Sequence, residues 1–215
     1  MLEVEIFSDV ICPWCFIGKR RLDTVLATEL GEDVALRWRP FLLYPNIPLE
    51  GVDRSELLKR RYGDGADAAR VPPRIAQEAE AEGLTFRFDL IKRTPNTLLA
   101  HRILEYAYPE GCQHELAEAL FQGYFCEGLD VGDAAILTKM AGKLGLDEAE
   151  VSAFLNGELF VEEIQTQLAR APELGISGVP GYYLANVFLL PGAQTSEVMG
   201  QILTRVKTRL AERQV

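Results

Sequence analysis

The sequence predicts an α/β protein in which a mixed sheet is interrupted by a long helical region. Two observations indicate this. Runs typical of strands occur near both ends of the chain, and helical spacing with capping residues dominates the middle. The chain has 215 residues, of which 48% are hydrophobic, so it can bury a substantial core. At about 150 residues per domain, one domain with a large insertion fits this length.

The first forty residues read as strand, helix, strand. Leu2, Val4 and Ile6 alternate with glutamates, which is the period-two pattern of a strand. A helix is expected from the Cys-Pro-Trp-Cys segment, residues 12–15, to about Glu29. A second strand is expected over 34–39, and a right-handed crossover would make the two strands parallel.

Helices are expected through the middle of the chain after a proline-rich linker at 44–51. Asp53 and Glu56 form a capping box, and Thr94 followed by Pro95 predicts the start of another helix. Pro172 must kink or end the last helix of the block. The expected helical ranges are 72–83, 94–108, 113–125, 133–144, 148–155 and 158–174.

The strand signal returns near the end. Strands at 182–184 and 187–190 flank a short turn at Ala185-Asn186, and a helix around 198–210 follows. Without the helical block, this order leaves a mixed sheet with helices on both faces, the layout of a thioredoxin fold. We therefore predict a thioredoxin fold with an inserted all-helical domain: residues 1–51 plus 175–215 form the first domain, and 52–174 the second.

Charge and composition exclude several functions. The chain holds 22 Lys and Arg against 32 Asp and Glu, a net charge of −10, which is unfavourable for binding nucleic acid or anionic membranes. No apolar run is long enough to span a bilayer, and the first residues lack the basic region of a secretory signal. We expect a cytoplasmic protein.

The Cys12-Pro13-Trp14-Cys15 segment carries the strongest chemical signal. Cysteines three residues apart at the start of a helix are neighbours, so they can form a disulfide with little backbone change. The helix N-terminus, through the amides of Trp14 and Cys15, would stabilise a thiolate on Cys12. Pro13 at the first helical position gives up no hydrogen bond. Cys12 is the expected nucleophile, and Cys15, further into the helix and more buried, would resolve the mixed disulfide.

Cysteines at this spacing can also have two roles outside redox chemistry. Cys-x-x-Cys is the spacing of a zinc half-site, but neither Cys112, Cys126, His101 nor His114 repeats it as a second pair. The cysteines could also be ordinary core residues. The position between a strand and a helix favours redox chemistry over both roles, and no metal site is predicted.

Several segments along the chain resemble one family. They are MLEVEIFSDVICPWCFIGKRRL, PNTLLAHR, YFCEGLDV, ELGISGVPGYYL and PGAQTSEV, and they are similar to DsbA-like thioredoxin-fold proteins of the FrnE type. The resemblance implies a thiol–disulfide oxidoreductase. Kappa-class glutathione transferases and 2-hydroxychromene-2-carboxylate isomerases share the fold but carry Ser in place of the nucleophilic Cys. One departure from the family pattern is Gly181, where a bulkier residue is expected.

The resemblance also assigns a role to Val179 and Pro180. Pro180 matches the cis-proline that faces the active disulfide, and Val179 would pair its backbone with an extended substrate. From the residues alone, a trans-proline opening an edge strand is the alternative.

Other candidate residues carry two interpretations each. Asn96 and His101 are candidate substrate-binding residues at the domain cleft, or polar contacts between domains. Trp14 is either an exposed contact for substrate or packed against the insertion. Asp9 would disfavour the Cys12 thiolate if its side chain turned inward. The basic run 19–21 is interpreted as a solvated helix face.

Cys112 and Cys126 flank one expected helix, about 21 Å apart at 1.5 Å per residue, so they cannot bond to each other. Each is interpreted as a free thiol, and an additional redox role for Cys126 is the alternative.

We therefore expect thiol–disulfide exchange with protein thiols and disulfides, with glutathione as a candidate co-substrate and no other cofactor. The alternative is a glutathione-dependent isomerase or transferase acting on a small aromatic molecule in the interdomain cleft. A redox-sensing or zinc-binding interaction module is a third hypothesis.

Overall fold

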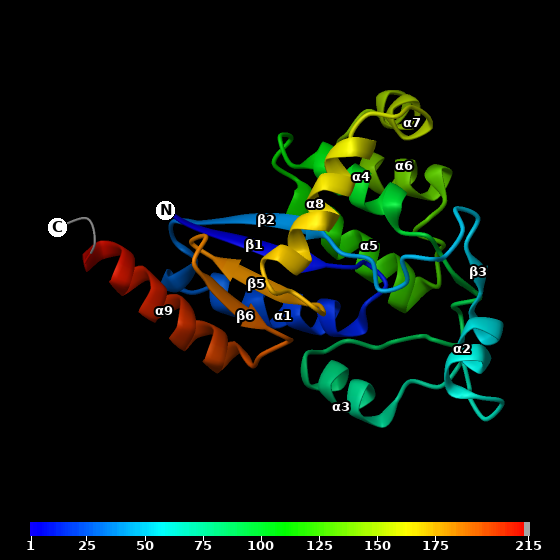
Figure 1. Cartoon of the computed structure of the whole chain (residues 1–215), viewed down its shortest axis with the longest axis horizontal. Helices are drawn as coiled ribbons and strands as arrows, with labels where there is room; N and C mark the ends of the chain where they lie inside the picture. The colour runs from blue at the N-terminus through cyan, green and yellow to red at the C-terminus, as the bar shows by residue number, and fades with distance from the viewer. Residues whose placement is uncertain (213–215) are drawn as a thin grey trace.

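A four-stranded sheet forms the centre of the computed structural model, which describes residues 1–212 (Figure 1). Strand β1 (Leu2–Ser8) pairs in parallel with β2 (Val34–Pro40) and antiparallel with β5 (Gly181–Leu184), which pairs with β6 (Phe188–Pro191). The order across the sheet is β2-β1-β5-β6. The predicted mixed sheet is confirmed.

Helices cover both faces of this sheet. Helices α1 (Pro13–Leu26) and α9 (Ser196–Glu212) pack against each other beside the core that contains Val4 and Ile6. Helix α8 (Val161–Glu173) crosses the opposite face, where Phe7 packs with Ala171 and Ile176 (Figure 1). A short 3₁₀ helix, η1 (Glu29–Gly31), follows α1, so the first helix ends slightly earlier than expected.

The middle of the chain is mostly helical. It also contains a two-stranded antiparallel sheet of β3 (Val52–Asp53) and β4 (Arg93–Thr94). The segment between these strands reaches along the molecule to the side of α1 (Figure 1). The helices of the middle region are α2 (Arg54–Tyr62), α3 (Pro73–Ala81), α4 (Leu98–Ala107), α5 (Gln113–Glu127), α6 (Ala134–Gly142) and α7 (Glu148–Asn156).

One continuous apolar core joins the sheet region to the helical region. Phe16 on α1 stacks on Phe121 of α5, with ring centroids 5.2 Å apart, and on Phe86 at 6.0 Å. Phe16 and Phe121 are fully buried. The burial of large aromatic rings therefore fixes α5 on α1 and sets the position of the middle region beside the Cys12–Cys15 segment.

The predicted cap at Asp53 was confirmed, and two further aspartates cap helices in the same way. Asp53, Asp133 and Asp147 each accept a hydrogen bond from an amide in the first turn of the following helix. Pro172 lies in the last turn of α8, which ends one residue later. Helix α8 begins at Val161, later than expected, because Phe160 adopts a left-handed conformation with φ of 64° before it.

The predicted helix start at Thr94-Pro95 was wrong. Thr94 is used in β4, where it pairs with Val52, and α4 begins at Leu98. The Asn96 side chain accepts a hydrogen bond from the Leu98 amide at 3.0 Å, which provides the turn before the helix. Strand pairing with a distant segment, invisible in local sequence, displaced the cap.

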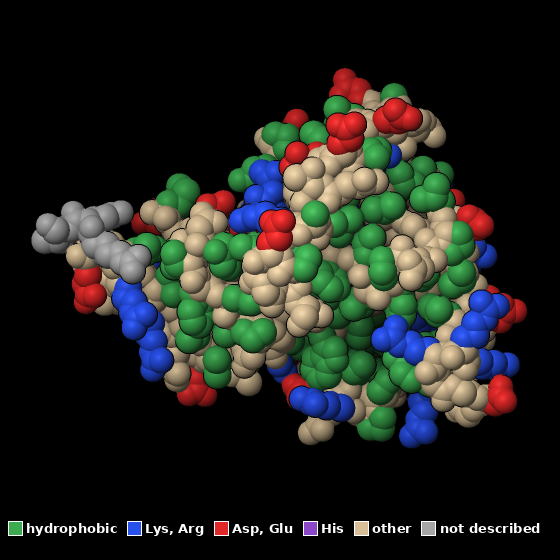
Figure 2. Space-filling model, viewed as in Figure 1, with side chains coloured by type: hydrophobic (Ala, Val, Ile, Leu, Met, Phe, Trp, Pro, Cys, Tyr) green, Lys and Arg blue, Asp and Glu red, His purple; other side chains and the backbone are tan. Residues whose placement is uncertain are grey.

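Within residues 1–212, no helix is both long and apolar enough to cross a bilayer. Both charged and hydrophobic side chains are present on the face of the molecule shown in Figure 2.

Candidate active site

Cys12 and Cys15 lie at the start of α1, directly after the turn that follows β1. Cys12 is the N-cap residue, and Pro13 is the first residue of the helix. The amide of Cys12 donates to the carbonyl of Asp9 at 2.9 Å, and the amide of Cys15 donates to the carbonyl of Cys12 at 3.0 Å. These bonds close the turn, so the strand end and the helix start hold the two thiols next to each other. Both cysteines are free thiols.

Both thiols are buried, with exposed fractions of 3% for Cys12 and 1% for Cys15. Burial raises the pKa of the Cys15 thiol well above its usual value, and the neighbouring Cys12 raises it further. The expected amide bonds to the Cys12 sulfur are not formed, since its side chain makes no capping hydrogen bond in the described part of the chain. The Cys12 side chain instead donates toward the Val179 carbonyl, with Sγ 3.8 Å from the oxygen.

The loop before β5 therefore faces the cysteine pair. The Val179–Pro180 peptide bond is cis. Pro180 also lies against α1: a Cβ built on Gly18 would be 3.2 Å from Pro180 Cγ. Val179 is half-buried and Pro180 is buried. This places the two predicted substrate-contacting residues beside Cys12, although they are 167 and 168 residues away in sequence.

A small cavity of about 280 Å³ lies beside this loop, lined by residues 175–181 together with Leu189, Pro191 and Gly192. A Cβ on Gly181 would lie 3.4 Å from Ile176 Cγ2 and 3.7 Å from Leu189 Cδ1, ordinary contact distances. The space at position 181 therefore accepts a Cβ without a clash. Because the native residue is glycine, no side chain covers this side of the loop.

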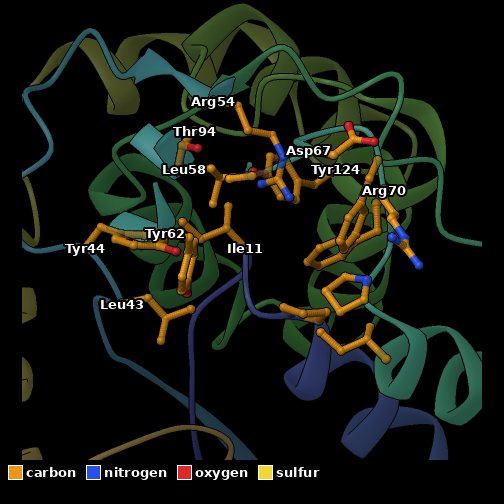
Figure 3. Close-up of a pocket in the computed structure, with 16 residues that line it drawn as sticks. Ile11, Leu43, Tyr44, Arg54, Leu58, Tyr62, Asp67, Arg70, Thr94 and Tyr124 are labelled. Carbon is orange, nitrogen blue, oxygen red and sulfur yellow. The ribbon is translucent and has the colours of Figure 1, made fainter. Parts of the chain in front are cut away.

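A larger pocket of about 400 Å³ lies on the other side of the Cys12–Cys15 segment (Figure 3). Its walls are Ile11 and Pro13, the loop residues Leu43 and Tyr44, and apolar and basic side chains of the middle region. Figure 3 shows Arg54 and Tyr124 directed toward the same space from different elements. We call this the interdomain pocket. Its remaining lining residues are Arg54, Leu58, Tyr62, Ala66, Asp67, Arg70, Pro72, Ile75, Phe88, Thr94, Tyr124 and Phe125.

Two buried hydroxyls in this pocket have no hydrogen-bond partner within residues 1–212: Tyr124 Oη and Thr94 Oγ1. Burial raises the pKa of Tyr124 to about 12, so its phenol remains a proton donor at neutral pH. Such unpaired buried groups are uncommon and mark a place where a polar ligand atom would be stabilised. Sequence reasoning read Thr94 as a helix start and did not single out Tyr124, because nothing local marks either residue as part of a pocket.

Trp14 packs toward the middle region, in agreement with the second of its two interpretations. It is half-buried and lies against the main core. The guanidinium of Arg74, which follows the first residue of α3, lies 5.3 Å from the centre of the indole ring. Trp14 is therefore part of the contact between α1 and α3.

His101 and Asn96 make bonds within the protein. His101 is 3% exposed, and its Nε2 lies 3.1 Å from the carbonyl oxygen of Phe41. The Asn96 amide donates to the carbonyl of Ile47 at 2.8 Å. Burial lowers the pKa of His101 to about 4 despite the Phe41 carbonyl. This geometry corresponds to the polar-contact interpretation, since both side chains are used to fix the 41–47 loop on the start of α4.

Asp9 is fully buried directly before the cysteine turn. Its carboxylate accepts hydrogen bonds from the amides of Leu43 at 2.8 Å and Ile11 at 3.4 Å. Burial raises the pKa of Asp9 to about 6, although these two amides and the side chain of Thr97 act in the opposite direction. The carboxylate is therefore held by the 41–43 loop. His101 Nε2 lies 3.8 Å from Asp9 Oδ1.

The interpretation of residues 19–21 as a solvated helix face was wrong. Lys19 is 3% exposed and Arg21 is 6% exposed. Lys19 pairs with Asp23 at 2.7 Å and with Glu118 at 3.0 Å. Arg21 pairs with Glu82 at 2.7 Å and with Glu78. Apart from Asp23 on α1 itself, the partner carboxylates come from α3, from the residue that follows it, and from α5, so this face of α1 is covered by the middle region.

Cys112 and Cys126 are separate free thiols at the two ends of α5. Burial raises the pKa of both, with nearby glutamates adding to the effect. Among residues 1–212, no group of three or more His, Cys, Asp or Glu side chains is arranged to hold a metal ion.

The family model that matches the chain is the DSBA-like thioredoxin domain, over residues 3–204. The chain belongs to the DsbA-like thioredoxin family. The sequence resemblance is thereby confirmed at the level of the family, and the FrnE subtype stays a prediction. A curated relative, the uncharacterised protein YwbO of Bacillus subtilis strain 168, is 28% identical over 94% of this chain and 96% of its own.

Solved structures with this DsbA-like fold include a probable DsbA oxidoreductase, SCO1869 from Streptomyces coelicolor. It is 29% identical, with a TM-score of 0.83, and the match covers 97% of this chain and 91% of that one. A 2-hydroxychromene-2-carboxylate isomerase matches with a TM-score of 0.70 at 16% identity, over 98% of both chains. The cytosolic disulfide reductase DsbM from Pseudomonas aeruginosa, in complex with GSH, matches at 0.64 and 15%, over 99% of this chain and 100% of its own. At these identities the last two show the shared fold.

Proposed function

We propose that the protein is a thiol–disulfide oxidoreductase whose redox centre is Cys12 and Cys15. The observation that carries the proposal is the position of both thiols at the N-terminus of α1, opposite the Val179–Pro180 loop. The helix dipole favours negative charge at this end, which supports a nucleophilic thiolate on Cys12. Membership of the DsbA-like family agrees with this chemistry.

The reaction proceeds in two exchanges. The Cys12 thiolate attacks one sulfur of a substrate disulfide, so that a mixed disulfide forms and the other substrate sulfur leaves as a thiolate. Cys15 then loses its proton and attacks Cys12 Sγ, which releases the second substrate thiolate and forms the Cys12–Cys15 disulfide. In the opposite direction, a substrate dithiol reduces this disulfide. The equilibrium depends on the reduction potentials of the two couples.

The Val179 backbone provides a place for the substrate chain. Its carbonyl oxygen lies 3.8 Å from the Cys12 sulfur, so a polypeptide bound along this backbone would pass close to the nucleophile. A polypeptide in extended conformation would add to this loop through main-chain hydrogen bonds. We propose protein thiols and disulfides as the partners, with a cytoplasmic location. The structure of DsbM with GSH supports glutathione as a candidate co-substrate.

The test is turnover of a disulfide-bonded model protein in the presence of glutathione. Replacing Cys12 with Ser is expected to abolish exchange, because the attacking sulfur is lost. The matched controls, Cys112→Ser and Cys126→Ser, remove the other two thiols and are expected to keep the wild-type rate. Exchange that persists in Cys12→Ser and stops in Cys126→Ser would contradict the assignment of the redox centre.

A second candidate function is a glutathione-dependent isomerase or transferase acting on a small aromatic molecule. The interdomain pocket favours it: its volume of about 400 Å³ and largely apolar lining suit a small ligand, and it adjoins Pro13. This reaction would need no resolving thiol. Turnover of a small aromatic substrate that requires glutathione and survives Cys15→Ser would support it, and loss of all activity in Cys15→Ser would exclude it.

A further inference from the structure

Two buried hydroxyl groups lie beside Cys15 and have no hydrogen-bond partner within the described residues 1–212. They are Ser8 Oγ, at the end of β1, and Tyr182 Oη, in β5. Ser8 is 3% exposed and Tyr182 is 2% exposed. Water therefore cannot readily satisfy them, and within residues 1–212 the protein does not. A buried polar group left without a partner is destabilising, so an acceptor that reached these hydroxyls would be favoured.

The strand register places both side chains under α1. Tyr182 is paired with Ile6, and Ser8 lies two residues beyond Ile6 on the same strand. Side chains two residues apart in a strand point to the same face, so Ser8 and Tyr182 share one face of the sheet. That face is covered by α1, because Tyr182 Oη would lie only 2.4 Å from a Cβ on Gly18. Gly18 is one turn after Cys15, on the same side of the helix.

Cys15 needs hydrogen-bond donors such as those that Ser8 and Tyr182 offer. To resolve a mixed disulfide it must lose its proton while only 1% of its surface is exposed. A buried thiolate without hydrogen-bond donors is strongly disfavoured. Burial raises the pKa of Cys15 well above its usual value, and the Ser8 hydroxyl acts in the opposite direction. Burial also raises the pKa of Tyr182, so its phenol keeps the proton that it would donate.

We propose that Ser8 and Tyr182 are the hydrogen-bond donors that stabilise the Cys15 thiolate during resolution of the mixed disulfide. In the resting dithiol neither hydroxyl makes a hydrogen bond of ordinary length within residues 1–212, and the thiolate supplies a stronger acceptor than the neutral thiol. The inference rests on the proposed function, because it concerns the second exchange of the same redox centre. It adds a role for two residues that lie outside the Cys-Pro-Trp-Cys segment.

The other titratable groups around this cluster are few. Cys12, Arg21 and Asp23 act on Tyr182 through their charge, and Cys12 also acts on Cys15. Arg21 and Asp23 are already engaged in ion pairs with carboxylates and Lys19, respectively. The Asp9 carboxylate accepts hydrogen bonds from the Leu43 and Ile11 amides, and the backbone amide of Asp9 lowers the pKa of Cys15. The hydroxyls are thus the polar side chains left to face the Cys15 sulfur.

The experiment uses an aromatic disulfide, 5,5′-dithiobis(2-nitrobenzoate), because it separates the two exchanges. Attack by Cys12 releases one coloured thiolate and leaves the other on Cys12 as a mixed disulfide. Attack by Cys15 on Cys12 releases the second thiolate and forms the protein disulfide, and its proton passes to the buffer. The full-length protein is mixed with this reagent, and the two phases are followed by stopped-flow absorbance across a range of pH.

We expect Tyr182→Phe and Ser8→Ala to slow the second phase and leave the first unchanged. If each substitution raises the pH midpoint of the second phase by about one unit, resolution slows about tenfold below that midpoint. Tyr183→Phe is the matched control, since Tyr183 donates to the Asn186 carbonyl at 2.7 Å, and its side chain points to the opposite face of the sheet. It is expected to keep both the rate and the midpoint.

The midpoint separates this role from a structural one. If Tyr182→Phe and Ser8→Ala retain the wild-type midpoint, the inference is wrong, whether or not both phases slow together. If the wild-type protein itself shows no second phase, the proposed function fails, and the inference fails with it. A wild-type second phase that neither substitution alters overturns only the inference.

Discussion

The two ends of helix α1 differ in how their polar neighbours are satisfied. Along the later turns, Lys19 and Arg21 are buried, and each charge is paired with two carboxylates. At the first turn, the hydroxyls of Ser8 and Tyr182 are buried beside two free thiols and have no hydrogen-bond partner in the part of the chain that the structure describes. Complete pairing fixes the middle region on the helix. At the first turn, the hydroxyls of Ser8 and Tyr182 remain available to the Cys15 thiolate, which exists only during the reaction.

The largest expected effect concerns the first turn. Cys15→Ser removes the resolving sulfur, so the mixed disulfide between Cys12 and a substrate protein should accumulate rather than turn over. Mass spectrometry under non-reducing conditions would detect it. Cys12→Ser is the control and should form no such adduct. An adduct on Cys15 in Cys12→Ser at the wild-type rate would show that the two sulfurs have exchanged roles.

The next effect concerns the paired end. Arg21→Met leaves Glu78 and Glu82 without their cation, and both remain partly in contact with water. We expect a loss of about 3 kcal/mol in the free energy of unfolding, at the low end for a broken buried pair. Urea denaturation would measure it. Arg60→Met is the matched control, because Arg60 and Glu56 form an exposed pair, which typically contributes at most about 1 kcal/mol.

Equal stability changes in Arg21→Met and Arg60→Met would contradict the assignment of Arg21 as a contact that holds α3 on α1.

A smaller effect is expected where the two ends meet, at Gly18. In Gly18→Ala the new Cβ would lie 2.4 Å from Tyr182 Oη and 3.2 Å from Pro180 Cγ. Such overpacking typically destabilises by about 1–3 kcal/mol. Tyr182→Phe removes the oxygen, so the double variant should recover part of the loss, and thermal or urea unfolding of all three variants would show it. Simple additivity of the two substitutions would mean that the contact is not formed.

The smallest effect concerns pH, because two buried groups oppose each other. Asp9 has a folded-state pKa of about 6 against 3.8 unfolded, so its contribution to stability decreases as pH rises through that window. His101 has a folded-state pKa of about 4 against 6.5, so its contribution decreases as pH falls from 6.5 to 4. The two slopes partly cancel between pH 4 and 6.

Asp9→Asn leaves the His101 slope alone, so this variant should lose stability on acidification from pH 6.5 to 4. His101→Gln leaves the Asp9 slope and should gain stability from pH 6 to 4. Unfolding free energies at several pH values would measure both. Parallel pH profiles for the two variants would contradict the opposite shifts.

Local sequence predicted what depends on local chemistry. Asp53 caps its helix, and the Cys12–Cys15 pair opens α1, because these features need only residues a few positions apart. The burial of Lys19 and Arg21 depends on Glu78, Glu82 and Glu118, which are 57 to 99 residues away.

The same limit applies to the β4 pairing that moved the start of α4, and to Tyr182, whose relation to Cys15 depends on strand register. A tyrosine in a strand reads as an ordinary core residue.

The most direct test of the account is the equilibrium between the Cys12–Cys15 dithiol and disulfide. The protein is equilibrated in glutathione buffers of graded potential, and its thiols are trapped and counted by mass. The account predicts a reversible two-electron transition between a dithiol and an intramolecular disulfide of Cys12 and Cys15, with a midpoint in the range of about −270 to −120 mV. Failure to form that disulfide at any potential would contradict it.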